Sequence, residues 1–346
     1  MEEQIEDEIS KKICRYEYDE FYDFREIGKS RFGMTVYKSK WKKRNFAVTH
    51  KNVTIDTIQN DSAKIDTIQD DKTKITIQNN KTFQEFTTEI RQLQKVGFHE
   101  NIIDFYGITK RMFFFFFNFS ESEWCYNIVQ LFASDGNLRE YLNEKFLRLR
   151  WIDKSRIANE ISNGLKFLHQ NNIVHQDINS KNILVHEGKI KIAGFGLSKM
   201  TEATSLIDER FFDLDSIAYT EPQCLKIKYE NNLTQEPDVY NLTQKSDIYS
   251  LGVVLWEISS GKPPFKSFSP RESLANHILK GNREEPMEKD TPQQYIDLYK
   301  KCWDNEPAKR PEMNEILEIL TNIYYQTIEK IELKYEKWGI NKELTF

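Results

Sequence analysis

The hydrophobic spacing of this chain changes near Gly136, and that change constrains the fold more than any other feature. Before Gly136, short β-type runs such as Thr35–Lys38 and Phe46–Val48 alternate with turns. After it, apolar residues recur at helical spacing in five segments, namely Leu138–Leu149, Ile152–His169, Leu251–Ser260, Tyr295–Trp303 and Met313–Ile328. A chain of 346 residues can bury a core in each part. We therefore predict an α+β, bilobal fold with a β-rich first lobe and a mainly α-helical second lobe.

The first lobe is predicted to contain one helix and one insert. Phe83–Val96 has helical spacing, and strands resume at Ile102–Ile108 and Cys125–Phe132. In residues 50–82 the triplet T-I-Q returns about every ten residues, which is too short for solenoid repeats of about 20–50 residues. We interpret this tract as a duplicated surface insertion. We expect an N-terminal extension (1–20), a two-lobed domain (21–323, with lobes 21–132 and 133–323) and a helical tail (324–346).

Composition narrows the partners and the cellular setting. Lys and Arg number 49 against 54 Asp and Glu, so the net charge of −5 gives no support for nucleic-acid binding. The four cysteines are scattered, without a CxxC pair, and the first eight residues are acidic. We therefore expect a reduced, cytoplasmic setting. The phenylalanine-rich run Met112–Phe119 is far shorter than the roughly 20 residues of a membrane-spanning helix, so we interpret it as a buried or partner-covered strand.

Val174–Leu184, V-H-Q-D-I-N-S-K-N-I-L, places an acid five residues before an amide, between apolar strand residues. Other motifs surround it in a fixed order, namely Gly28-x-x-x-x-Gly33-x-x-Val36, Ala47-Val48, Glu89, G-F-G at 194–196, T-E-P-Q at 220–223, S-D-I-Y-S-L-G at 246–252, and C-W at 302–303 followed by Arg310. With these motifs the chain resembles the protein-kinase family from about Phe21 to Ile323. D-I-N-S-K-N-I-L, W-E-I-S-S-G-K-P-P-F and C-W-D-N-E-P-A-K-R-P are similar to its tyrosine-kinase-like branch, whose members mostly phosphorylate serine or threonine.

The resemblance implies roles for residues that this chain keeps. In residues 174–184, the catalytic loop, Asp177 would accept the proton of a substrate hydroxyl, Asn182 would hold a magnesium ion, and Lys181 would steady the transferred phosphate. ATP binding would fall to Gly28, Gly33, Val36, Ala47, Leu131, Ala133 and Leu184, with Gln130 controlling the depth of the base pocket. Leu93, Phe105, His175 and Phe195 match the stacked side chains of an active-like kinase, with Asp247 as their anchor.

Five positions depart from the family pattern. Ser30 replaces a glycine, and Gln176 replaces an arginine that often binds a phosphorylated activation loop. Thr49 stands where a strand lysine should bind phosphate, and Gly194 replaces the aspartate that holds the bridging metal. Gln223 replaces a glutamate, so we expect the charge pairing with Arg310 to be lost.

Lys51 is a candidate replacement for the missing lysine. Residues two apart on a strand point to the same face, and they lie roughly 6.6 Å apart along the strand. Lys51 could replace the lysine missing at position 49, with Glu89 as its partner. The alternative is an exposed lysine at the end of a strand.

The residues that depart from the family pattern are mainly those that would bind phosphate and metal, whereas the residues that match it are mainly those that pack the two lobes. We predict a pseudokinase that acts as a scaffold or allosteric regulator of protein partners, either a kinase or its substrates. ATP could bind to it without a metal ion. Asn182 alone would hold Mg²⁺, and only weakly. The alternative is a weak or atypical ATP-dependent serine/threonine kinase that uses Asp177, Asn182 and Lys51. A member of another ATP-binding class and a purely structural protein are further alternatives.

Overall fold

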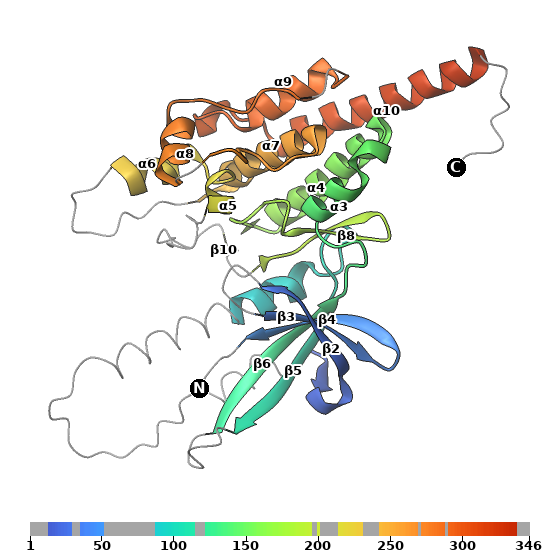
Figure 1. Ribbon diagram of the computed structural model, residues 1–346, viewed down its shortest axis with the longest axis vertical. Helices are drawn as coiled ribbons and strands as arrows, with labels where there is room; N and C mark the ends of the chain where they lie inside the picture. The colour runs from blue at the N-terminus through green and yellow to red at the C-terminus, as the bar shows by residue number, and fades with distance from the viewer. Residues whose placement is uncertain are drawn as a thin grey trace. The chain divides into compact units, whose positions relative to one another are not determined.

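The structure is a computed structural model of the 346-residue chain, and most of its helices and strands are labelled in Figure 1. It describes residues 13–29, 35–51, 87–114, 122–195, 199–200, 214–230, 242–268, 271–287 and 290–337. The chain divides into two compact units, the first with residues 1–98, 103–132 and 194–197 and the second with the remainder. The first unit is mainly β-sheet and the second mainly helical, which confirms the predicted α+β, bilobal fold class.

A six-stranded sheet forms the first unit, in the order β1-β5-β6-β4-β3-β2. Its strands are β1 (Arg15–Glu17), β2 (Tyr22–Lys29), β3 (Thr35–Trp41), β4 (Arg44–Lys51), β5 (Phe105–Phe114) and β6 (Ser122–Leu131). Strands β2 to β6 pair antiparallel, whereas β1 pairs parallel with β5. The short 3-10 helix η1 (Tyr18–Glu20) joins β1 to β2. The N-terminal residues 15–17 are therefore an integral strand of this sheet.

The aromatic side chains on one side of this sheet surround Phe46. The buried core contains Phe21, Phe46, Val48 and Val129, against which Tyr16, Phe24, Trp41 and Tyr106 pack. The ring of Tyr16, contributed by β1, lies 5.2 Å from that of Trp41 and 5.9 Å from that of Phe21, both in edge-to-face geometry. Such pairs stabilise beyond the area they bury. Burial raises the pKa of the Tyr16 hydroxyl.

Residues 87–96 of the first unit are helical, with Ile90, Leu93 and Val96 buried. The spacing of these three residues agrees with the helix expected over Phe83–Val96. The expected insert and residues 83–86 lie outside the described residues. So does most of the phenylalanine-rich run, of which strand β5 includes residues up to Phe114.

The second unit begins with short elements around the catalytic loop. They are α3 (Leu138–Lys145), η2 (Phe146–Arg148), α4 (Trp151–Gln170), β7 (Ile173–Val174), β8 (Ile183–His186), β9 (Lys189–Ile192) and β10 (Lys199–Met200). Asn137 caps α3 by accepting a hydrogen bond from Glu140 N at 3.0 Å, while the Glu140 side chain accepts one from Asn137 N at 3.1 Å. Strands β8 and β9, which follow the catalytic loop in the chain, pair antiparallel with each other. Strand β7, which precedes the loop, pairs antiparallel with β10.

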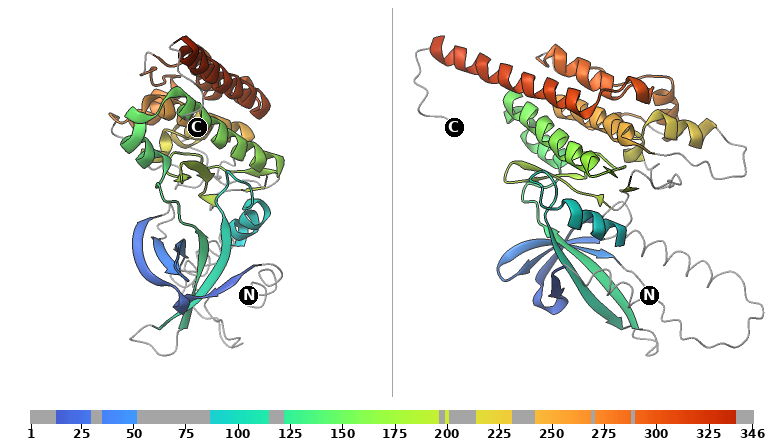
Figure 2. Two further views of the ribbon diagram at one scale, coloured as in Figure 1. Left: turned by 90° about the vertical axis from the view of Figure 1, so that its right-hand side faces the viewer. Right: turned by 180° about the vertical axis from the view of Figure 1, so that it is seen from behind.

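The remaining helical elements complete the second unit. They are α5 (Leu214–Ile217), α6 (Pro222–Glu230), α7 (Gln244–Ser260), α8 (Arg271–Leu279), α9 (Gln293–Cys302), η5 (Pro307–Lys309) and α10 (Met313–Lys337). Helix α7 is buried along most of its length. Helix α10 runs beside α4 and continues past its end (Figure 2), without a break at the boundary expected near Ile323. Among the described helices, none is long and apolar enough to cross a membrane.

Candidate functional site

The catalytic loop leaves β7 at Val174, and its backbone is fixed by the carboxylate of Asp247 on α7. Oδ2 of Asp247 accepts a hydrogen bond from His175 N at 2.8 Å, and Oδ1 accepts one from Gln176 N at 2.8 Å. Nε2 of His169, near the end of α4, lies 2.9 Å from Oδ2. Gln176 has φ +67°, a left-handed conformation that is uncommon for residues other than glycine. The two bonds to Asp247 hold the backbone in this conformation.

His175 is buried and its hydrogen bonds define its tautomer. Its Nδ1 accepts a hydrogen bond from Asp177 N at 3.2 Å, so the ring proton is on Nε2, which donates to the carbonyl of Ala193 at 2.9 Å. Burial lowers the pKa of His175, against the opposing effect of the carboxylates of Asp247 and Asp177. The neutral ring thus connects the catalytic loop to the residue before Gly194.

Asp177 and Asn182, the expected proton acceptor and metal ligand, contact each other directly. Nδ2 of Asn182 donates to Oδ2 of Asp177 at 2.7 Å and to its carbonyl oxygen at 2.9 Å. The other carboxylate oxygen, Oδ1, accepts a hydrogen bond from Nδ2 of Asn179 at 2.8 Å. The side chain of Lys181 is exposed. Sequence reasoning did not single out Asn179, although an asparagine side chain often accepts a hydrogen bond from the backbone two residues further on, as Asn179 does from Lys181 N.

Gly194 follows directly after Ala193, whose N–H donates to the carbonyl of Asn182 at 2.8 Å. Its φ of +86° is a left-handed conformation that glycine adopts without strain. The position expected to supply a metal-binding carboxylate therefore has no side chain and a backbone that favours glycine.

The described residues do not provide a fitting set of ligands for a resident Mg²⁺. This cation prefers several oxygen donors in near-octahedral geometry. Of the two expected ligand positions, Gly194 has no donor side chain, and Asn182 offers only the neutral Oδ1 while its Nδ2 donates to Asp177. Within the part of the chain that the structure describes, no group of three or more His, Cys, Asp or Glu side chains is placed to hold a metal.

Several residues expected to contact ATP lie on neighbouring strands of the first unit. Gly28 is paired with Val36, and Ala47 is paired with Gln130 on β6. Leu131 follows Gln130 and donates its N–H to the carbonyl of Asp104 at 3.0 Å. The sheet thus brings together three adjacent strands that carry Val36, Ala47 and Leu131.

The other expected residues fall in the second unit or outside the described part. Ala133 is buried, and Leu184 on β8 is partly buried. Ser30 and Gly33 lie outside the described residues. For Thr49 and Lys51 only the backbone is described, with Thr49 opposite Val36 and Lys51 opposite Tyr126. The predicted pairing of Lys51 with Glu89, which is buried on the 87–96 helix, therefore also lies outside the described side chains.

The loss of charge pairing inferred from Gln223 is wrong, because Arg310 pairs with Glu221 instead. Nη1 of Arg310 lies 2.6 Å from Oε2 of Glu221, and both side chains are almost completely buried. Ser246 Oγ donates to the other carboxylate oxygen of Glu221. A glutamate two residues before the expected position therefore supplies the charge, and Gln223 is partly exposed. The T-E-P-Q motif contained this carboxylate, but sequence alone did not show which side chain points inward.

A second buried carboxylate, Glu257 on α7, also contacts the catalytic loop. Its Oε1 accepts hydrogen bonds from Ser180 Oγ at 2.9 Å and from Arg139 Nε at 3.2 Å, while Oε2 accepts one from the hydroxyl of Tyr219. Burial raises the pKa of Glu257, and the nearby guanidinium of Arg139 opposes that shift. This network connects the loop to α3 and to the segment before α6.

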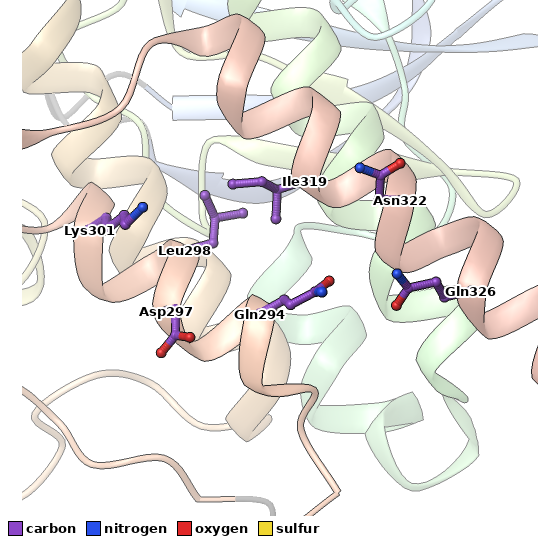
Figure 3. Close-up of a pocket in the computed structure, with 7 residues that line it drawn as sticks. All are labelled: Gln294, Asp297, Leu298, Lys301, Ile319, Asn322 and Gln326. Carbon is purple, nitrogen blue, oxygen red and sulfur yellow. The ribbon is translucent and has the colours of Figure 1, made fainter.

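A separate pocket of about 310 Å³ lies between α9 and α10 (Figure 3). Leu298 and Ile319 are its apolar residues, and its polar lining comprises Gln294, Asp297, Lys301, Asn322 and Gln326. None of the residues singled out from the sequence lines it.

Comparison with known proteins agrees with the bilobal fold. Residues 23–320 match the family described as protein tyrosine and serine/threonine kinase. The chain therefore belongs to the protein-kinase family, and the resemblance inferred from the motifs is confirmed.

Similar proteins are kinases of a plant and a slime mould. The chain is 29% identical over 242 residues to the serine/threonine/tyrosine-protein kinase HT1 of Arabidopsis thaliana, which covers 69% of this chain and 55% of that protein. It is 29% identical to the dual specificity protein kinase shkC of Dictyostelium discoideum, over 70% of this chain and 44% of that protein. It is 26% identical to the serine/threonine-protein kinase STY17 of Arabidopsis thaliana, over 71% of this chain and 38% of that protein. The chain thus spans between about two fifths and a little over half of these relatives.

Proposed function

We propose that this chain is a pseudokinase that acts through protein partners, as a scaffold or an allosteric regulator of an active kinase or its substrates, and that binds ATP without a metal ion. The observation that carries the proposal is Gly194, which has no carboxylate where the family places its bridging metal ligand. Removing one positioned electrostatic group commonly lowers a rate by about 10² to 10³. Thr49 removes a second such group from the phosphate site.

The retained framework supports a structural role for this fold. Asp247 fixes the catalytic-loop backbone, Glu257 binds Ser180 and Arg139, and the buried pair of Glu221 and Arg310 is intact. Val36, Ala47 and Leu131 on adjacent strands support the proposal that an adenine ring still binds. The scattered cysteines support a reduced, cytoplasmic setting.

A second candidate function is a weak serine/threonine protein kinase. The specific observation in its favour is the catalytic loop, in which Asp177 and Asn182 keep the family's spacing and contact each other. Lys51 would then replace the phosphate-binding lysine, and Lys181 would contact the transferred phosphate.

Phosphoryl transfer by the purified chain separates the two functions. The protein is incubated with labelled ATP and Mg²⁺ or Mn²⁺ and an exogenous protein substrate, beside an Asp177→Ala variant prepared in the same way. The pseudokinase proposal expects the same background incorporation in both samples. Incorporation that the Asp177→Ala substitution abolishes would favour the weak kinase and refute the pseudokinase.

Thermal unfolding in the presence of ATP tests the proposed replacement by Lys51. If Lys51 binds phosphate, Lys51→Met abolishes the stabilisation that ATP confers on the chain. Lys43→Met, on the exposed turn between β3 and β4, is the matched control and leaves the stabilisation unchanged. An unchanged ATP effect in Lys51→Met would show that this lysine does not bind the phosphates.

A further inference from the structure

Asn179 uses both ends of its side-chain amide within the catalytic loop. Its Nδ2 donates to Oδ1 of Asp177 at 2.8 Å and to the Asp177 carbonyl oxygen at 3.1 Å. Its Oδ1 accepts hydrogen bonds from the backbone N–H of Lys181 at 2.9 Å and of Asn182 at 3.2 Å. One side chain therefore closes the turn from Asp177 to Asn182 from both directions.

The carboxylate of Asp177 depends on two such amides. Asn179 donates to Oδ1 and Asn182 donates to Oδ2, the latter at 2.7 Å. Asp177 is only 8% exposed, and a buried carboxylate is costly unless hydrogen bonds satisfy it. Each oxygen of the carboxylate thus receives a donor from the loop itself.

We propose that Asn179 is the residue that positions Asp177, and that Asp177 serves in this chain as the internal hydrogen-bond acceptor that closes the catalytic loop. The first part stands on the hydrogen bonds alone. The second part rests on the proposed function, because it assigns Asp177 a structural role in place of proton acceptance.

This assignment explains why Asp177 and Asn182 remain while the carboxylate at position 194 is absent. Loss of the Asp177 carboxylate would leave Asn179 and Asn182 only the Asp177 carbonyl oxygen as an acceptor, and loss of either asparagine would remove one donor from the carboxylate. Hydrogen bonds lost from a buried site destabilise a fold. An aspartate at position 194 would be required for a metal, whereas the hydrogen bonds that close the loop join Asp177, Asn179 and Asn182 and do not involve residue 194.

A donor–acceptor exchange in the full-length chain tests the positioning role. The variants are Asp177→Asn, Asn179→Asp and the two together, and the measurement is the folding equilibrium constant from urea unfolding. Each single substitution is expected to lower this constant by about tenfold or more, because a hydrogen bond to a charged group is lost. The double variant reverses donor and acceptor in the side-chain pair but loses the bond from residue 179 to the carbonyl of residue 177, so it is expected to recover part of the loss. Additive losses would overturn the positioning role.

Asn171 provides the matched control. Its Nδ2 donates to the carbonyl of Phe167 at 2.9 Å, at the C-terminal end of α4. Asn171→Asp combined with Asp177→Asn is therefore expected to give additive losses. Recovery in this pair would show that the rescue at position 179 is not specific, and would also overturn the proposal.

Hydrogen exchange of the backbone amides provides a second test if the single variants do not fold. In Asn179→Ala, the N–H of Lys181 loses its side-chain acceptor, whereas the N–H of Asn182 keeps the carbonyl of residue 179 at 3.1 Å. Hydrogen exchange at Lys181 is therefore expected to accelerate at least about tenfold relative to the unaltered chain. An unchanged exchange rate at Lys181 would overturn the proposal. Phosphoryl transfer that Asp177→Asn abolishes would overturn the structural role of Asp177 together with the proposed function, without affecting the test of Asn179.

Discussion

The guanidinium of Arg310 is buried against the carboxylate of Glu221, and neither side chain can reach bulk water. Removing one partner of a buried ion pair leaves an uncompensated charge, which typically costs about 3–5 kcal/mol. We predict that Glu221→Ala lowers the free energy of unfolding by about this amount, measured by urea denaturation. Gln223→Ala, two residues away at a partly exposed position, is expected to change it by less than about 0.5 kcal/mol.

A double variant shows whether this cost comes from the charge. Replacing both partners, as in Glu221→Ala with Arg310→Met, removes the buried charge altogether. It should therefore cost less than the sum of the two single substitutions. A large loss from Gln223→Ala, with little loss from Glu221→Ala, would instead show that Gln223, and not Glu221, stabilises the buried guanidinium of Arg310.

The buried ring of His175 makes stability depend on pH. Burial lowers its pKa in the folded chain below the ordinary value of 6.5. As the pH falls below 6.5, the unfolded chain therefore binds a proton that the folded chain does not bind, and stability decreases. At higher pH the ring is neutral in both states, so the contribution is complete. We predict that the free energy of unfolding falls as the pH is lowered from 7.5 towards 5.

His175→Gln tests the origin of this slope, because glutamine does not titrate between these values. The variant is expected to be less stable throughout, with a smaller loss between pH 7.5 and 5 than the unaltered chain shows. His99, whose pKa is also lowered by partial burial, provides the comparison through His99→Gln. If the slope persists in His175→Gln and disappears in His99→Gln, the second ring is responsible.

At the scale of elements, strand β1 depends on a glycine in β5. Ile108 N donates to the carbonyl of Cys14 at 3.1 Å, and a Cβ on Gly107 would lie 2.0 Å from that carbonyl oxygen. We predict that Gly107→Ala separates β1 from β5, with a loss of about 1–3 kcal/mol in stability. Hydrogen exchange at the Ile108 amide is expected to accelerate, and mass spectrometry of peptides covering this strand would detect the change.

Gly107 also has φ +150°, so part of the cost arises from backbone strain and not from the contact with Cys14. Deleting residues 1–17 separates the two contributions, because the shortened chain has no Cys14 carbonyl to displace. In that background Gly107→Ala should cost less than in the full chain. An equal cost in both backgrounds would mean that β1 is not displaced.

The order of the elements was readable from the sequence, whereas their ends and shortest members were not. Helix α7 starts at Gln244, seven residues before the predicted Leu251, because the side chain of Thr243 accepts a hydrogen bond from Lys245 N at 3.2 Å. Capping is a local signal that periodicity does not contain. Strand β1 has three residues and only a parallel partner, so no alternation could reveal it. Its stability comes from Tyr16 packing on aromatic residues distant in sequence.

The candidate site could likewise be predicted from the sequence only in part. The resemblance to the family's motifs marked Asp177, Asn182 and Gly194 as candidate site positions, because those motifs follow one another in a fixed order along the chain. The roles of Asn179 and Glu221 depend on which side chains turn inward, and the tertiary fold determines this. The ion pair of Arg310 shows what the motif alone could not predict. The carboxylate comes from Glu221, two residues before the motif position that Gln223 occupies, so the ion pair is kept although the motif is not.

At the scale of the whole molecule, nucleotide binding is expected to stabilise the chain independently of a metal. A ligand at 100 times its dissociation constant stabilises the folded state by about 2.7 kcal/mol, which corresponds to a rise of several degrees in Tm. We predict equal Tm shifts for the unaltered chain with ATP plus EDTA and with ATP plus Mg²⁺. A shift that requires Mg²⁺ would contradict the proposed loss of metal binding, and no shift in either condition would contradict ATP binding.

Gly194→Asp determines whether the missing carboxylate is the cause of this metal independence. The substitution restores an oxygen ligand, so the Tm shift with ATP plus Mg²⁺ should exceed the shift with ATP plus EDTA in this variant alone. Both Gly194→Asp and the matched control Gly194→Ala place a side chain at φ +86°, which costs roughly 1–2 kcal/mol without ligand. Because the two variants share that strain, a Mg²⁺-dependent difference between them reports on the carboxylate. If Gly194→Asp remains indifferent to Mg²⁺, the absence of a phosphate-binding lysine at position 49 is sufficient to prevent metal-dependent binding.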